Sequence, residues 1–391
     1  MRRLILRPHA VSEVQGAEQV KFVWVDEALS ITLKGPFLRL AERFATAQGA
    51  QAVAESLGPQ VEAQIAARAI ERLVDAGVLI DSARAEWETS ARTGLFGAPV
   101  LSAHAAVTGD ADVIVVGVPY DAGTTYRPGT RFGPQAIRRA STAVFQLTEP
   151  PTGMYDPVRE ERVLQGVRIR DIGDVLPDVG GGRQFSDAQA LAQRVTEVGK
   201  FLLVLGGDHS ISAPVIAGVA QAKGEIGVLH FDAHNDYSRP VAAHATGMHH
   251  GNFLNWVAGN DAVVHMLQCG IRQLSPAQPE PITKRELLAG RKWLEGDGEV
   301  LLNGMSPDIP WYITVDVDVI DPTLMPATGT PLPGGVTWEE LTRTLELVMR
   351  KRTVVGLDVV EFLPDGSDTP GLEIAALLVR VLDGVGGATR S

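Results

Sequence analysis

The sequence predicts an α/β fold, with a mostly parallel sheet that helices cover on both faces. From about residue 100, apolar runs of strand length alternate with segments whose apolar residues recur at helical spacing. The runs at 112–118, 227–231 and 311–315 are almost wholly apolar, as strands buried between two layers are. Because parallel strands need crossover connections, strands separated by helices favour a parallel sheet.

Composition places the chain among folded proteins and argues against two classes of partner. Of its 391 residues, 45% are hydrophobic and 21% are charged, which is enough for a full core. The net charge of −12, with no run of Lys or Arg, argues against nucleic-acid binding. No apolar stretch reaches the roughly 18 residues of a membrane span, and the apolar part of the N-terminus is short for a signal peptide. We therefore expect a soluble, cytoplasmic protein.

Residues 1–90 show a different pattern and are expected to form a small α+β module. Short strands and amphipathic helices are predicted there, at 20–25, 29–33, 36–44 and 60–73. This order is compatible with a winged-helix-like module. An extension that packs on the main domain or on a neighbouring subunit explains the pattern equally well. A linker rich in Ser, Ala and Gly follows, so we place the main domain at 91–391.

The main domain is predicted to alternate strands and helices along the chain. Pro134 suits the first turn of a helix that begins at Gly133. Ser186 is a candidate N-cap for a helix over 188–198. Further elements are expected as strands at 202–205, 227–231, 263–268, 311–315 and 353–358, and as helices at 212–222 and 337–351. The single cysteine, Cys269, lies in an apolar run and is expected to be a buried side chain rather than a nucleophile.

Three metal-capable side chains follow the strand at 227–231. Asp232, His234 and Asp236 occupy alternate positions, and alternate residues of an extended segment face the same side. A mixed set of oxygen and nitrogen donors suits a borderline divalent ion such as Mn, Fe, Co, Ni or Zn. Taken alone, the same pattern also fits a polar strand end with solvated acids.

Two more predicted strands end in the same way. His209 follows the run at 202–205, while Asp316 and Asp318 follow the run at 311–315. Ligands of open α/β sheets bind beyond the carboxyl ends of the strands, so these side chains should meet. Six candidate ligands suit two ions that share bridging carboxylates, for which Asp232 and Asp316 are the best candidates. Such a pair of ions activates water at neutral pH, which predicts hydrolysis or hydration.

Two further segments supply candidates for catalysis and substrate binding. His249 and His250 adjoin each other, and a histidine beside a metal centre can shuttle a proton to a leaving group. Glu361 ends another apolar strand, where a carboxylate can pair with a planar cation such as guanidinium. We expect all three to contact substrate. Both segments also have an explanation that involves no functional site. The two histidines could simply cap a loop, and Glu361 could be a solvated acid at the start of a loop.

The chain from about 110 to 385 resembles the ureohydrolase family of arginases and agmatinases, which cleave guanidino groups to urea and an amine. The likeness is carried by segments 129–138, 206–210, 232–236, 316–322, 326–335 and 358–361. The resemblance implies a three-layer α/β/α sandwich with an arginase-like sheet. It also implies two Mn²⁺ ions per subunit, or Ni²⁺ or another transition metal, and assembly into trimers or hexamers. By the same resemblance, His250 matches the proton shuttle and Glu361 the guanidinium-binding glutamate.

The substrate tail is where the chain departs from arginases, which read the α-amino group of free arginine with an aspartate. Ser275 stands where that aspartate is expected, and the segment 237–240 matches the carboxylate-reading loop poorly. A neutral side chain discards a charge pair of about 2–3 kcal/mol. We therefore expect an agmatinase-like enzyme, with a guanidino acid or free guanidine as further candidates.

Three more functions are compatible with the sequence. Residues 1–90 are similar to modules with which peptide-modifying enzymes hold a leader peptide, so the chain is also a candidate peptide arginase that converts arginine residues to ornithine. A metal-dependent deacetylase also uses metals at strand ends, and it would release acetate rather than urea. A scaffold protein without catalysis is the third candidate.

Overall fold

The chain divides into two compact units in the computed structural model. The described residues are 3–6, 11–16, 19–24, 29–44, 48–57, 63–82, 94–98, 100–101, 103–148, 151–176, 182–237, 247–274 and 284–387. One unit comprises Met1–Arg92 with Pro99–His104, and the other comprises Thr93–Ala98 with Ala105–Ser391. Each unit has a hydrophobic core of its own.

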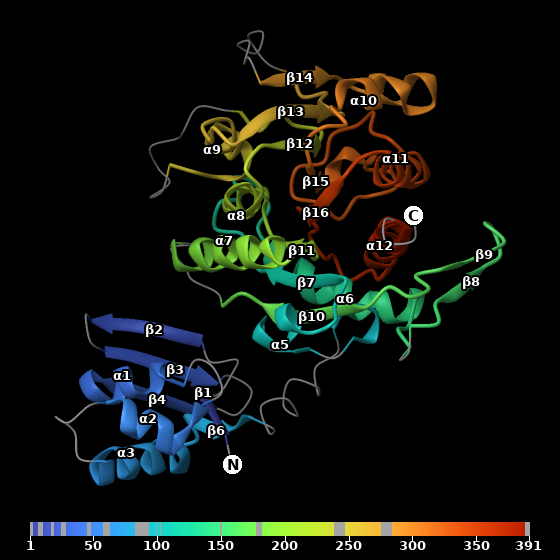
Figure 1. Ribbon diagram of the computed structural model, residues 1–391. Helices are drawn as coiled ribbons and strands as arrows, with labels where there is room; N and C mark the ends of the chain where they lie inside the picture. Colours follow the sequence, from blue (N-terminus) through green and yellow to red (C-terminus); the bar gives the residue numbers. More distant parts are fainter. Residues whose placement is uncertain are drawn as a thin grey trace. The chain divides into compact units, whose positions relative to one another are not determined.

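The larger unit is built on an eight-stranded sheet in which every pair of neighbouring strands is parallel (Figure 1). The strand order is β10-β7-β11-β16-β15-β12-β13-β14. The strands are β7 (Val113–Val118), β10 (Ile169–Asp174), β11 (Phe201–Gly206), β12 (Ile226–Phe231), β13 (Val263–Cys269), β14 (Arg285–Leu288), β15 (Trp311–Asp316) and β16 (Val354–Val360). The predicted parallel sheet is thus confirmed.

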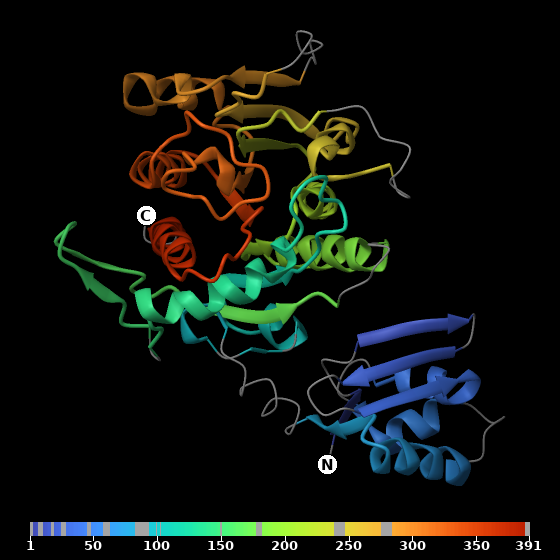
Figure 2. The same ribbon diagram turned by 180° about the vertical axis from the view of Figure 1, so that it is seen from behind.

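Helices cover both faces of this sheet, which gives three layers. Helices α7, α8 and α9 lie on one face, and α6, α10, α11 and α12 lie on the other (Figures 1 and 2). Their bounds are α6 (Gly133–Val144), α7 (Gly182–Glu197), α8 (Ser212–Lys223), α9 (Leu254–Ala258), α10 (Glu299–Gly304), α11 (Trp338–Lys351) and α12 (Thr369–Gly387). The predicted three-layer α/β/α arrangement is confirmed. Among the described residues, no helix is long and apolar enough to cross a membrane.

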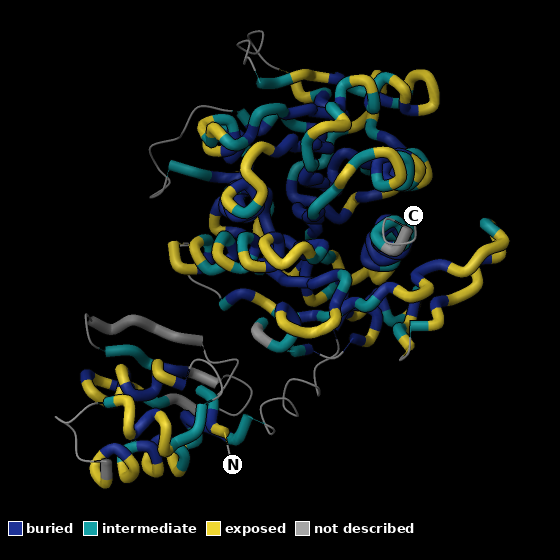
Figure 3. Tube along the Cα trace, in the orientation of Figure 1, coloured by how far each residue is buried: buried dark blue, intermediate teal, exposed yellow. Residues whose placement is uncertain are grey.

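The core of the larger unit lies where the sheet meets these helices (Figure 3). All residues of β7, β11, β12 and β15 are buried, as expected of central strands covered on both faces. Cys269 at the end of β13 is fully buried, and burial raises the pKa of its thiol well above the ordinary value. This confirms the expectation that Cys269 is a packing residue rather than a nucleophile.

The smaller unit contains two three-stranded antiparallel sheets, ordered β2-β3-β4 and β5-β1-β6. Its elements are β1 (Arg3–Leu6), β2 (Val11–Gly16), β3 (Gln19–Trp24), β4 (Leu29–Lys34), α1 (Gly35–Glu42), β5 (Gln48–Gly49), α2 (Ala50–Ser56), α3 (Ala63–Asp75) and β6 (Leu79–Asp81). The four elements expected at 20–25, 29–33, 36–44 and 60–73 correspond to β3, β4, α1 and α3, although residues 25 and 60–62 lie outside the described residues. The winged-helix likeness stays a prediction.

Several elements of the larger unit differ from the expectation. Helix α7 begins at Gly182, so Ser186 lies inside the helix, where its hydroxyl donates to the carbonyl of Arg183, and the predicted N-cap is wrong. Pro134 does lie in the first turn of α6, as expected. The elements that sequence periodicity did not reveal include the hairpin of β8 (Met154–Asp156) and β9 (Glu161–Val163), strand β14, and helices α10 and α12.

A buried ion pair joins α6 to β10. Arg138 donates from Nε to Oδ2 of Asp171 at 2.8 Å and from Nη2 to Oδ1 at 2.9 Å. Asp174 also pairs with this guanidinium. Asp171 is fully buried and accepts the N–H of Leu95 as well, so its charge depends on Arg138 for compensation.

Replacing Arg138 with Met should destabilise the larger unit by about 3–5 kcal/mol, because it leaves a buried carboxylate without its cation. Urea unfolding followed by circular dichroism measures the effect. Arg139→Met is the matched control, since Arg139 pairs with Asp368 and both side chains are 70% exposed. The control should cost less than about 1 kcal/mol. Equal stability of the two variants would contradict the structural role of the buried pair.

Candidate active site

Four neighbouring strands of the sheet, β11, β16, β15 and β12, present their carboxyl ends side by side. A candidate site residue stands at or just beyond each of these ends. His209 follows β11, Glu361 follows β16, Asp316 ends β15 and Asp232 follows β12. The parallel order therefore gathers side chains that lie more than 150 residues apart in the sequence, at the edge of the sheet where ligands bind.

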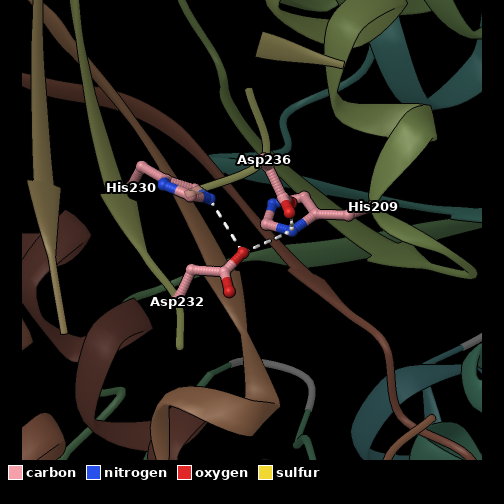
Figure 4. Close-up of side chains that lie close together, drawn as sticks. All are labelled: His209, His230, Asp232 and Asp236. Carbon is pink, nitrogen blue, oxygen red and sulfur yellow. Dashed lines mark hydrogen bonds and ion pairs between the residues drawn. The ribbon is translucent and has the colours of Figure 1, made fainter. Parts of the chain in front are cut away.

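The first group of side chains surrounds one nitrogen of His209. Nδ1 of His209 lies 3.1 Å from Oδ2 of Asp232 and 3.2 Å from Oδ2 of Asp236. Its distance to Oδ2 of Asp316 is 3.3 Å. Figure 4 shows Asp232 and Asp236 directed at this ring. All four residues are buried, so one nitrogen and three carboxylate oxygens converge in the interior of the protein.

A hydrogen-bond chain behind His209 fixes the state of its ring. The hydroxyl of Thr314 donates to Oδ1 of Asp358 at 2.6 Å, so its oxygen accepts from Nε2 of His209 at 2.8 Å. In the neutral ring Nδ1 then carries the lone pair. Among the described residues, this Nδ1 makes no well-formed hydrogen bond and faces only the three carboxylate oxygens described above. A lone pair oriented by a partner on the other ring nitrogen is the arrangement of a metal-ligating histidine.

The second group lies on the other side of Asp232. Nδ1 of His234 is 2.9 Å from Oδ2 of Asp318 and 3.4 Å from Oδ1 of Asp232. The two oxygens of Asp232 thus face two different histidines, as a carboxylate that bridges two ions does. Oδ1 of Asp316 instead accepts the N–H of Asp318 at 2.8 Å, and its bridging role stays a prediction.

The electrostatics of both groups favour a bound cation. Burial opposes the charged form of His209, but the surrounding carboxylates, led by Asp232, raise its pKa well above the ordinary value. In the same way Asp232 and Asp318 overcome burial and raise the pKa of His234 to about 12. Burial and the charge of Asp232 raise the pKa of Asp236 to about 7. The raised pKa values mean that protons balance the buried carboxylates. Divalent ions would supply the same positive charge, so the residues present fit a metal centre.

His230 is a site residue that the sequence analysis missed. Nε2 of Gln268 donates to Nδ1 of His230 at 3.0 Å and to the carbonyl of Asn235 at 3.0 Å. The proton of the neutral ring therefore lies on Nε2, which donates to Oδ2 of Asp232 at 3.0 Å (Figure 4). Burial lowers the pKa of His230, which keeps the ring neutral. His230 orients the shared carboxylate, and its alternate position before Asp232 and His234 was the available signal.

Glu361 and His250 are brought together beside the metal groups. Oε1 of Glu361 accepts the backbone N–H of His209 and the Nδ1–H of His250, both at 2.9 Å. Oε2 of Glu361 is buried and has no hydrogen-bond partner among the described residues. A buried carboxylate oxygen without a partner is costly, so this atom marks a place for a donor from a ligand.

Backbone strain is concentrated at two of these residues. Asp236 has φ 47° and Glu361 has φ 62°, the left-handed region that side chains other than glycine rarely adopt. Each such residue costs about 1–3 kcal/mol and persists where the surroundings fix it. Both strained residues carry carboxylates directed into the site, which is consistent with a functional role for the conformation.

His249 and Asp208 accept hydrogen bonds from backbone N–H groups of the loops around the site. His249 caps the short helix at 250–252, accepting the N–H of Gly251 on Nδ1 at 3.2 Å, as a histidine pair that caps a loop would; its substrate contact stays a prediction. Asp208 accepts the N–H groups of Ser210 and Gly123. The residue before Asp208 is Gly207, and only glycine fits there, since a Cβ atom would lie 1.8 Å from the carbonyl oxygen of Tyr120.

Metal affinity should fall as pH falls, because ligation needs unprotonated side chains. The pKa of Asp236 is about 7 in the folded protein, against an ordinary value of 3.8 in the unfolded chain. Between about pH 4 and pH 7, folded Asp236 therefore holds a proton that the unfolded chain has released. In that window the metal-free protein loses stability as pH rises, while ions bind better. Apparent affinity for Mn²⁺ at pH 6 should be at least about tenfold weaker than at pH 8. Calorimetric titration tests this, and a pH-independent affinity would contradict the ligand assignment.

Comparison with known proteins places this geometry in a family. The sequence matches the arginase family over residues 111–382. The agmatinases of Edwardsiella ictaluri and Serratia proteamaculans are 34% and 33% identical, and the matches cover 70% of this chain and 88% and 87% of theirs.

Solved structures agree with the sequence matches. Proclavaminate amidino hydrolase from Streptomyces clavuligerus superposes with a TM-score of 0.66 at 27% identity, covering 76% of this chain and 98% of that one. A putative agmatinase from Clostridium difficile superposes with a TM-score of 0.59 at 25% identity. The superposition covers 72% of this chain and 99% of that one. The chain therefore belongs to the arginase family, and it is a metal-dependent hydrolase of the ureohydrolase type.

Proposed function

We propose that the protein cleaves the guanidino group of a small substrate to urea and an amine, with agmatine favoured over free arginine. The observation that carries the proposal is the buried, unpartnered Oε2 of Glu361 beside two groups of metal-capable side chains. The agmatinases among the relatives support the choice of substrate class. Ser275, the residue that argued against free arginine, lies outside the described residues.

Six residues would hold two divalent ions. His209 and Asp236 would serve one ion and His234 and Asp318 the other, with Asp232 shared and Asp316 beside the first. We favour Mn²⁺, with Ni²⁺ or another transition metal as the second choice, because the donors mix oxygen and nitrogen. Two such ions would lower the pKa of water in the site and so would supply the nucleophile for hydrolysis at neutral pH.

Glu361 would bind the guanidinium end of the substrate. Its Oε1 is already occupied by the backbone of His209 and the ring of His250, while Oε2 remains open to an N–H donor. A guanidinium presents planar N–H donors and a positive charge, which pair well with a buried carboxylate. The pairing would place the guanidino carbon next to the metal ligands.

His250 would carry the proton that the leaving amine needs. Hydrolysis adds water across the bond from the guanidino carbon to the alkyl nitrogen, and that nitrogen leaves as an amine only when protonated. Burial opposes the charged ring, but Glu361 raises the pKa of His250 to about 9, which keeps a proton available near neutral pH. The ring also touches the carboxylate that would hold the substrate.

A groove in the smaller unit favours a second candidate, a peptide arginase. The groove has a volume of about 730 Å³ and lies between β1, α2 and α3. Its floor is apolar and includes Ala54 and Ile70. Glu55, Glu71 and Asp75 line it, and none of its described lining residues is basic. Residues 1–82 as a whole are nearly balanced, with nine Lys and Arg against ten Asp and Glu, so it is the acidic lining of the groove that suits a basic peptide.

Substrate preference is tested by urea release from the Mn²⁺-loaded full chain with agmatine, arginine, a guanidino acid, guanidine and an arginine-containing peptide. We expect kcat/KM for agmatine to exceed that for arginine at least about thirtyfold, the equivalent of a missing charge pair. Release of urea from none of them, or of acetate from acetylated amines instead, would overturn the proposal.

The same assay separates the two candidates. If the peptide is the substrate, Glu55→Gln with Glu71→Gln should weaken its turnover and leave agmatine turnover unchanged. Glu42→Gln is the matched control, because this exposed residue of the same unit does not line the groove. Equal peptide turnover in both variants would exclude recruitment through the groove.

Glu361→Gln should retain both ions and lose about a hundredfold in kcat/KM, because the amide keeps the acceptor for His209 and His250 but not the charge for guanidinium. Metal content and urea release are measured on the same sample. Loss of metal together with activity would show that Glu361 belongs to the metal centre instead.

A further inference from the structure

The loop between β7 and α6 makes a direct contact with the far side of the His250 ring. The backbone N–H of Thr125 donates to Nε2 of His250 at 3.1 Å. The hydroxyl oxygen of Thr125 lies 2.7 Å from the same nitrogen. Because Nδ1 of the ring faces Glu361, the two ring nitrogens look in opposite directions, one to the site and one to this loop.

The two donors of Thr125 differ in what they can do. The backbone N–H requires a lone pair on Nε2, so it stabilises only the neutral ring with its proton on Nδ1. The hydroxyl can donate to that lone pair, and it can also accept from Nε2–H once the ring is charged. The hydroxyl is therefore suited to both states through which a proton shuttle passes.

The position of Thr125 is fixed by contacts on both sides. Gly123 donates its N–H to Oδ2 of Asp208 at 2.8 Å, and its carbonyl accepts the N–H of His250 at 3.3 Å. On the other side, Arg127 donates to the carbonyl of Gly329 at 3.1 Å and to that of Thr328. Thr125 itself is exposed, so a loop held at both ends presents its hydroxyl to the His250 ring and to water.

We propose that Thr125 is a positioning residue for His250, whose hydroxyl holds Nε2 in both protonation states and connects it to solvent. The inference rests on the proposed function. When the charged ring gives a proton to the leaving amine, Nδ1–H breaks and an N–H bond of the amine forms, while the neutral ring keeps Nε2–H and donates it to the Thr125 oxygen. Uptake of a solvent proton at Nδ1 restores the charged ring, and the exposed Thr125 hydroxyl holds Nε2–H throughout.

Charged groups from several elements face His250 and set its titration. Glu361 approaches from the end of β16, Asp208 from the loop after β11 and Asp236 from the loop after β12. All three favour the charged ring. The loop between β7 and α6 carries two cations, Arg127, whose guanidinium is engaged by backbone carbonyls, and Arg131, which pairs with Asp121. Removing the Thr125 hydroxyl changes none of these charges, so a shift in the titration would report the hydroxyl itself.

The test compares Thr125→Val with Thr125→Ser in the Mn²⁺-loaded full chain. Val keeps the shape and the backbone N–H but removes the hydroxyl, whereas Ser keeps both donors. We expect Val to lower kcat about 10–100-fold with KM nearly unchanged. Because the charged ring loses its acceptor, the pKa assigned to His250 in the pH profile should fall by about one unit. Ser should behave as the wild type, and added imidazole should restore part of the Val activity.

Thr124→Val is the matched control, because the buried hydroxyl of Thr124 has no hydrogen-bond partner among the described residues. It should leave kcat and the pH profile unchanged. If Thr125→Val retains the wild-type kcat and profile, or if its loss is not relieved by Ser or imidazole, the inference is wrong. A wild-type enzyme that releases no urea from any guanidino compound would instead overturn the proposed function. NMR titration of the His250 ring in the metal-free protein then tests the contact without turnover.

Discussion

The carboxylate of Asp232 is the constraint on which the rest of the site depends. One of its oxygens faces His209 and the other faces His234, so two groups of ligands share a single side chain. His230 fixes its direction by donating to Oδ2. The parallel sheet places this carboxylate next to those of the neighbouring strand β15, and burial removes the water that would otherwise solvate them. Such a concentration of negative charge is stable only with protons or cations to balance it.

Several other features follow from that concentration of charge. Asp236 has a left-handed backbone conformation, and its carboxylate reaches the ring of His209. Glu361, which follows β16 on the far side of β15, is left-handed as well, and its carboxylate accepts the backbone N–H of His209. Glu361 presents one oxygen to the protein and leaves the other for a donor from outside. His250 links this carboxylate to the loop of Thr125 and so to the surface. The two groups of metal-capable side chains, Glu361, His250 and the loop of Thr125 therefore form one connected set of contacts.

Sequence patterns predicted the parts of the site that depend on local geometry. The pattern after the apolar strand predicted that Asp232, His234 and Asp236 gather at its end, but not how, because the chain bends at residues 233–234 and Asp236 is left-handed, so the segment is not the extended one on which the alternation argument rests. Contacts between distant segments could not be obtained that way: Gln268 reaches His230 from the next strand, and Thr125 reaches His250 across 125 residues. The predicted N-cap at Ser186 was wrong because a serine near the start of a helix, with its hydroxyl on a backbone carbonyl, and an N-cap serine look alike in the sequence.

Metal content per chain is the most direct test of the shared carboxylate. We would measure it by mass spectrometry after equilibration with Mn²⁺, for the wild type, Asp232→Ala and Asp318→Ala. The account predicts two ions in the wild type, one in Asp318→Ala, which disrupts only the His234 group, and none retained in Asp232→Ala, which disrupts both. A single ion in the wild type, or two ions retained in Asp232→Ala, would contradict it.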